Sequence, residues 1–235
     1  MPRAKLEAAL SGIDWNSNVT FFLKGTVNSE IFAQSNLRLA VWSRQFEKAD
    51  AGNTALSFIR EMQVAGHYVP ALTALALYKP AAAAMRTAFE TALYYTYFRS
   101  HPTELATLIR DKNYFVSKSD IIVYHKIHTS DFRTLEQSFG LIGRMEEWYG
   151  FVSSLIHGQI PGQWHTHTDL EKLRHMESLI PEVAKAFNDG EEIVHNLFLC
   201  TAGRELWDAF SSGAKKQLLS KLAKDKKLAL GLDAA

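Results

Sequence analysis

The sequence lacks the features that would mark a secreted or membrane-bound chain. Its single cysteine, Cys200, cannot form an internal disulfide, which fits a reducing compartment. The most apolar run, residues 72–88, is interrupted by Lys79, Pro80 and Arg86, so no window offers the roughly 18 uncharged apolar residues that a membrane span needs. The first residues contain no apolar stretch typical of a signal peptide. We therefore expect a cytoplasmic protein without a membrane partner.

The sequence also lacks an excess of one charge. With 26 basic and 25 acidic residues the formal net charge is +1, so no global field favours nucleic acid or membrane. The C-terminal part differs, because six lysines after residue 213 face only two aspartates. A solvated helix face explains this bias, and so does a surface for an RNA backbone or a protein partner. The candidate nucleic-acid contacts are Lys215, Lys216, Lys221 and Lys224.

Several catalytic motifs are missing. There is no G-x-x-x-x-G-K-[ST] phosphate loop, no G-x-G-x-x-G motif and no G-x-S-x-G elbow, which disfavours nucleotide hydrolases and α/β-hydrolases. The nine histidines contain no H-E-x-x-H motif. The pairs His125/His128 and His165/His167 come without a third ligand at the usual spacing. We expect neither a metal nor another cofactor.

Strand signals are few, and apolar residues recur at helical spacing, so the predicted fold is an all-α helical bundle. We expect a helical or irregular N-terminal extension over residues 1–53, with a β-like patch at residues 19–23. The bundle core is predicted over residues 54–212. A basic C-terminal helix or tail is predicted over residues 213–235.

Proline, glycine and capping residues predict helix limits within the core. A helix after Thr54 is expected to be interrupted at Gly66 and Pro70. A second helix should run from Pro80 to about Arg99, and because it is apolar nearly all round it should lie at the centre of the bundle. The capping-box pattern Thr168–Glu171 predicts a helix over residues 169–188, followed by another over residues 190–210.

Two charged residues interrupt the apolar surface of the central helix. Arg86 and Glu90 are four residues apart and so share one helical face. A charged pair on a helix that is otherwise buried must be matched by its surroundings or serve a function. A structural ion pair that fixes helix packing and a functional pair both remain open.

A second polar stripe is expected on a later helix. Tyr149, Ser153 and His157 follow one another at intervals of four residues and would face the same way, opposite Val152 and Leu155. His157 would lie in the last turn, before a glycine suited to a helix C-terminus. A histidine at that position can act as a general acid or base, or it can simply cap the helix.

These two segments together, Arg86-x3-Glu90 and Tyr149-x3-Ser153-x3-His157-Gly158, resemble an uncharacterised family of prokaryotic helical proteins related to the HEPN superfamily. The resemblance covers about residues 54–160. It implies a helical bundle that often forms dimers. It also implies metal-independent ribonuclease activity in toxin–antitoxin, CRISPR and phage-defence systems.

In the HEPN nucleases an arginine lies four to six residues from the catalytic histidine. Residues 150–153 contain no arginine, so this chain departs from that pattern. Arg86 from the neighbouring helix would fill the same space, with Glu90 orienting Arg86 or His157. Tyr149 and Ser153 would then donate hydrogen bonds, and His157 would accept the proton of a ribose 2′-hydroxyl.

The sequence thus predicts a cytoplasmic, dimeric, HEPN-like effector directed at RNA, with His157, Arg86 and Glu90 at the centre of its site. Its activity would be that of a metal-independent endoribonuclease in antiviral defence or a toxin–antitoxin operon, where a protein partner is also expected. The alternative is a non-catalytic helical subunit that binds a protein or nucleic acid.

Overall fold

The computed structural model describes residues 2–165 and 167–232, and this part of the chain is helical without strands. The all-α prediction is therefore confirmed. In chain order the α-helices are α1 (Pro2–Ser11), α2 (Trp15–Lys24), α3 (Thr26–Ala49), α4 (Leu56–Ala74), α5 (Tyr78–Phe98), α6 (Pro102–Arg110), α7 (Lys118–His128), α8 (Phe132–Phe139), α9 (Leu141–Ile156), α10 (Leu179–Cys200), α11 (Ala202–Glu205), α12 (Ser212–Leu219) and α13 (Lys224–Leu230). Two short 3₁₀ helices, η1 (Leu170–Lys172) and η2 (Trp207–Ala209), complete the set.

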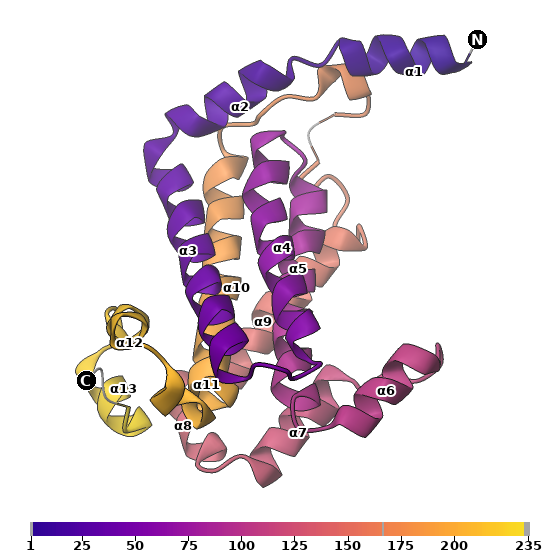
Figure 1. The fold of residues 1–235 in the computed structure, drawn as a ribbon. Coiled ribbons are helices and arrows are strands. Elements are labelled where there is room, and N and C mark those ends of the chain that lie inside the picture. Colours follow the sequence, from indigo (N-terminus) through magenta and orange to yellow (C-terminus); the bar gives the residue numbers. More distant parts are fainter. Residues whose placement is uncertain (1, 166, 233–235) are drawn as a thin grey trace.

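The long helices α3, α4, α5, α9 and α10 run alongside one another as the body of the bundle (Figure 1). α1 and α2 lie across one end, beside the segment that carries η1. α6 and α7 lie at the opposite end, and α12 and α13 form a small lobe next to α3 and α8. Within the described residues, no helix has the length and apolar character needed to cross a membrane.

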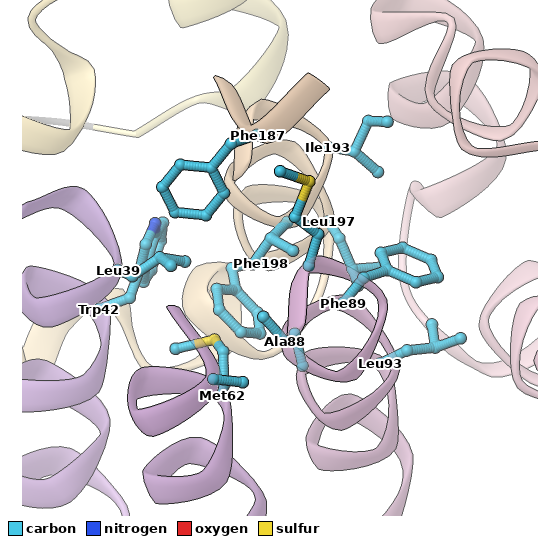
Figure 2. Packing of buried hydrophobic residues seen from close by; sticks show 14 of the residues in the cluster. Leu39, Trp42, Met62, Ala88, Phe89, Leu93, Phe187, Ile193, Leu197 and Phe198 are labelled. Carbon is cyan, nitrogen blue, oxygen red and sulfur yellow. The ribbon is translucent and has the colours of Figure 1, made fainter. Parts of the chain in front are cut away.

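The core is rich in aromatic side chains that meet between α3, α5 and α10 (Figure 2). Trp42, Phe46 and Phe198 are fully buried, and their rings pack against one another at centroid distances of 4.9 to 5.4 Å. Each such side chain contributes about 1.5–3 kcal/mol through burial. α5 is buried along most of its length, as the sequence predicted for residues 80–99, and it ends before Pro102 as expected.

The N-terminal residues differ from the prediction in two ways. Residues 19–23 belong to helix α2, whose first turn is capped by the Asp14 carboxylate accepting from Ser17 N at 2.8 Å, so the β-like patch was wrong. α3 contributes Trp42 and Phe46 to the core, so the predicted boundary at residue 53 does not separate a peripheral extension from the bundle. Within residues 2–53, α1 and α2 cross one end of the molecule, whereas α3 runs along the bundle.

α4 continues through the two residues that were predicted to break it. Gly66 faces α3 so closely that a Cβ there would lie 2.8 Å from Leu39 Cδ1, which explains a glycine in mid-helix. Pro70 lies inside the same helix at the cost of one backbone hydrogen bond. α4 packs along both α3 and α5, and this packing holds the helix together across the proline.

The helices predicted over residues 169–188 and 190–210 are also corrected. Residues 170–172 form only η1, and α10 is one continuous helix from Leu179, with Pro181 in its first turn, where proline is tolerated. Gly190 does not interrupt α10, because it makes room for Trp148. A Cβ at position 190 would lie 2.3 Å from Trp148 Cζ2, and Trp148 Nε1 donates to Ala186 O at 2.7 Å.

Candidate functional site

α5 presents Arg86 and Glu90 one turn apart on the side that faces α9. Arg86 Nε donates to Glu90 Oε1 at 2.8 Å. The two side chains are 27% and 38% exposed, so both can be reached from solvent. The pair was expected on one helical face, and it lies there at the edge of the core rather than inside it.

α9 supplies the facing polar stripe because its other side is anchored in the core by Met145, Trp148, Val152 and Leu155. The Tyr149 hydroxyl donates to Glu90 Oε1 at 2.6 Å. The Arg86 guanidinium also lies over the Tyr149 ring, 4.8 Å from its centroid. Tyr149 therefore contacts both members of the α5 pair, once through its hydroxyl and once through its ring face.

His157 ends α9, where its backbone N–H bonds to Ser153 O at 3.0 Å and Gly158 follows with φ +64°. Its exposed ring reaches back to α5, and His157 Nε2 lies 3.2 Å from Arg86 Nη1. A guanidinium has donors but no acceptor, so Nε2 is the acceptor in this contact.

Four of the five predicted site residues thus form one connected group: His157, Arg86, Glu90 and Tyr149. The fifth, Ser153, is not joined to it. Its hydroxyl is buried and has no hydrogen-bond partner among the residues that the structure describes. The serine lies on α9 at the predicted position, but its buried hydroxyl does not take part in the contacts of the group.

The Tyr149 phenol is held in its protonated form. Burial raises the pKa of Tyr149 to about 12, and the hydrogen bond to the Glu90 carboxylate adds to this effect. Tyr149 is therefore a hydrogen-bond donor at neutral pH and unsuited to act as a base. Within the group, His157 carries the imidazole, the side-chain type that most often transfers protons in catalysis.

A sixth residue at this site was missed in the sequence. Lys118 Nζ lies 4.8 Å from the centroid of the Tyr149 ring and pairs with Glu146. It comes from the first turn of α7, whose capping box is formed by Ser117 and Asp120. That S-x-x-D pattern was a local signal for a helix start, but nothing in it indicates that Lys118 faces Tyr149.

Arg86 and Lys118 provide two cations at this site, and His157 adds an imidazole beside Arg86. Arg86 and Lys118 both lie against the ring of Tyr149, and His157 contacts Arg86, on the surface formed by α5, α7 and α9. Such a cluster is suited to an anion, and a planar guanidinium is suited to the paired oxygens of a phosphate.

The predicted nucleic-acid contacts lie elsewhere. Lys215 and Lys216 are on α12, Lys221 follows it, and Lys224 begins α13. α12 packs on α3 and α13 packs on α8, so these lysines do not join the Arg86 group.

The histidine pairs considered for a metal have other surroundings. His125 is buried, and its two ring nitrogens lie 2.8 Å from the hydroxyls of Thr96 and Thr129. Burial lowers the pKa of His125 to about 4, so the ring is neutral and structural. His165 and His167 stack with centroids 6.2 Å apart. Across the described part of the chain, no three histidine, cysteine or acidic side chains gather as a metal site.

Comparisons with protein-family models, with curated proteins and with solved structures find no match for this chain. The site is therefore interpreted from its own geometry.

Proposed function

We propose that this chain is a cytoplasmic HEPN-like effector that binds RNA and cleaves it without a metal ion. The observation that carries the proposal is the contact of 3.2 Å between His157 Nε2 and Arg86 Nη1 on the exposed surface between α5 and α9. This contact places a candidate general base next to a phosphate-binding group, so both lie within reach of one bound RNA. The setting would be antiviral defence or a toxin–antitoxin operon.

The proposed reaction begins when an RNA phosphate takes the place of His157 as the partner of Arg86. This exchange frees the Nε2 lone pair, which accepts the proton of the 2′-hydroxyl as the 2′-oxygen attacks phosphorus. The bond from phosphorus to the 5′-oxygen breaks, and that oxygen takes a proton from solvent. The products are a 2′,3′-cyclic phosphate and a 5′-hydroxyl end. Arg86 stabilises the charge that develops on the phosphate.

Glu90 and Tyr149 are positioning residues in this scheme. Glu90 accepts hydrogen bonds from Arg86 Nε and from the Tyr149 hydroxyl through the same oxygen, Oε1. This arrangement fixes the guanidinium plane while leaving its Nη1 edge toward His157. Lys118 adds positive charge beside the tyrosine ring.

The test is cleavage of a fluorescently labelled RNA by purified protein in EDTA. We expect His157→Ala to lose cleavage by at least about 100-fold, the usual contribution of a general base. Arg86→Lys should also be strongly impaired, because an ammonium lacks the guanidinium fork. The matched control is His67→Ala, which removes an exposed histidine on α4. Cleavage that persists in both folded site variants contradicts the proposal.

A second candidate is a non-catalytic subunit that binds a protein or nucleic acid. It is favoured by the closed contacts of the site, since His157, Arg86, Glu90 and Tyr149 satisfy one another without a ligand. RNA binding by the wild type with no cleavage under any metal condition would support this candidate. The C-terminal lysines would then provide the RNA surface, and raised salt would weaken binding steeply.

Dimerisation is part of the proposal. α6, α7 and the segment between them leave large apolar side chains exposed at one end of the bundle: Ile109 on α6 (78% exposed), Phe115 between the helices (73%) and Ile127 on α7 (62%). Large apolar side chains exposed in this number are a feature that protein interfaces cover. Light scattering should show a dimer, and Phe115→Glu together with Ile127→Glu should shift it to a monomer.

A further inference from the structure

A second polar site lies on the other side of α10, in a pocket between α3, α10 and α12. Its volume is about 360 Å³, near the lower end of the range of about 300–1,000 Å³ for small-molecule sites. α3 contributes Ser35 and Arg38, α10 contributes Glu191, and Lys221 comes from the segment after α12. Most of the side chains that α10 buries are apolar and belong to the core. The pocket differs from that core because its lining is polar.

The floor of the pocket is a buried ion pair. The Glu191 side chain is fully buried and that of Arg38 is 17% exposed. Arg38 Nε lies 2.7 Å and 2.8 Å from the two carboxylate oxygens, and Arg38 Nη2 also contacts Glu191. Apolar residues of similar size usually stabilise a fold as well as a buried pair does. A pair that faces a pocket has a further use, because Glu191 orients the guanidinium for a ligand.

The wall of the pocket carries a hydroxyl without a partner. Ser35 is 2% exposed, and its Oγ has no hydrogen-bond partner among the described residues. It lies one turn before Arg38 and lines the same pocket. An unsatisfied buried hydroxyl destabilises a fold, whereas a ligand with a polar group would satisfy it.

The mouth of the pocket holds both signs of charge. Lys221 Nζ donates to Gln34 Oε1 at 2.8 Å, and Gln34 Nε2 donates to Glu30 Oε1 at 2.9 Å. Since Glu191 already neutralises Arg38, Lys221 is the cation that remains for an anionic ligand. The amides of Asn188 and Gln217, which also line the pocket, can donate and accept hydrogen bonds.

We propose that this pocket binds a nucleoside 5′-monophosphate. The phosphate lies between Lys221 and the Nη1 edge of Arg38, the edge that Glu191 does not use. The base and ribose hydrogen-bond to Ser35 Oγ and the two amides. A mononucleotide combines the anionic group, the polar edges and the small size that these contacts require. The proposal is independent of RNA cleavage at Arg86 and His157.

The experiment is isothermal titration of the full-length protein with AMP, GMP, CMP and UMP, each compared with its nucleoside and with inorganic phosphate. We expect at least one mononucleotide to bind more tightly than both its nucleoside and phosphate. If none of the four binds at about 1 mM, a threshold that corresponds to very weak affinity, the proposal is wrong. Equal binding of inorganic phosphate would show a simple anion site and would also overturn it.

Substitutions test which residues bind the mononucleotide. Lys221→Gln and Ser35→Ala should each weaken the mononucleotide about tenfold, which corresponds to about 1.4 kcal/mol. Lys48→Gln removes an exposed charge on α3 outside the pocket and should change nothing. Loss of binding in His157→Ala would assign the nucleotide to the Arg86 site and would overturn the proposal. Unchanged affinity in both pocket variants overturns the proposal.

Ser35→Ala carries a second readout. Without ligand, its melting temperature should equal or exceed that of the wild type, because the variant removes an unsatisfied hydroxyl. A clear drop would show that Ser35 has a structural partner, against the proposal. Lys221→Gln changes an exposed residue, so the variant should fold like the wild type. Its affinity for the mononucleotide therefore tests the proposal.

Discussion

Two arginine–glutamate pairs in this molecule have the same chemistry and different surroundings. Arg38 and Glu191 join α3 to α10, and the carboxylate is fully buried. Arg86 and Glu90 belong to one helix, α5, and are about one-third exposed. The attraction between the charges is strong in the first pair because the pair lies in the protein interior. In the second pair water screens that attraction.

The difference separates a contact that holds the fold from a contact that can rearrange. Removing a partner from a buried pair leaves an uncompensated charge, whereas exposed pairs within a helix contribute little to stability. The Arg86 pair can therefore exchange its contacts for those of a ligand at small cost. Three of the four predictions below test this contrast, and the other extends it to a buried and an exposed glycine.

The largest effect is expected from breaking the buried pair. Arg38→Met should lower the free energy of unfolding by about 3–5 kcal/mol, because Glu191 is left buried without its partner. Arg86→Met should lower it by less than about 1 kcal/mol. Urea unfolding followed by circular dichroism measures both. Equal losses would mean that the two pairs do not differ as their burial indicates.

The second prediction concerns pH. Burial raises the pKa of Glu191 from 4.5 to about 7, although Arg38 acts in the opposite direction. Between these values the folded protein holds a proton that the unfolded chain has released, so the free energy of unfolding should fall as pH rises. At about 1.4 kcal/mol per pKa unit, the fall attributable to Glu191 is at most about 3 kcal/mol.

The measurement is the difference in unfolding free energy between wild type and Glu191→Gln from pH 4.5 to 8. That difference should decline up to about pH 7 and then level off. Glu61→Gln, which removes an exposed carboxylate on α4, serves as the control. A difference that grows with pH would show that Arg38 outweighs burial.

The third prediction compares a buried glycine of α10, which faces Trp148 of α9, with an exposed glycine of α9. Gly190→Ala should destabilise by about 1–3 kcal/mol, because the new methyl group meets the Trp148 ring. Gly150→Ala, on the exposed side of α9, meets nothing within 4 Å and should stabilise by about 0.5–1 kcal/mol. Thermal unfolding of the two variants gives the comparison, and opposite signs are expected.

The smallest stability effect should come from Tyr149→Phe. It removes the hydrogen bond of 2.6 Å to Glu90 and keeps the ring beneath Arg86. The free energy of unfolding should change by about 1 kcal/mol or less. RNA cleavage should fall about tenfold if Tyr149 positions Glu90 and Arg86, as a change of 1.4 kcal/mol would produce. Unchanged cleavage would remove Tyr149 from the proposed site.

The sequence predicted those features that depend on periodicity within one helix. The spacing of Arg86 and Glu90, and of Tyr149 and His157, was enough to place each pair on a shared face. The facing of α5 and α9 could be proposed only as a requirement of the chemistry, and the structure brings four of the five residues together.

Features that depend on a distant neighbour were not predicted. Glycine and proline in α4 were interpreted as breaks because Leu39, which fills the space at Gly66, is 27 positions away in the chain. The pocket at Ser35 and Glu191 joins residues more than 150 positions apart, and no local pattern marks it. Lys118 was missed for the same reason.

The fit of Trp148 against Gly190 has a consequence for how this sequence can vary. An indole on α9 occupies the volume that any side chain on α10 would need at that point. A smaller residue at position 148 would leave room for a side chain at position 190. A side chain at position 190 would leave no room for tryptophan at position 148. The two positions should therefore change together, and a compensating double substitution should recover stability that either change alone would lose.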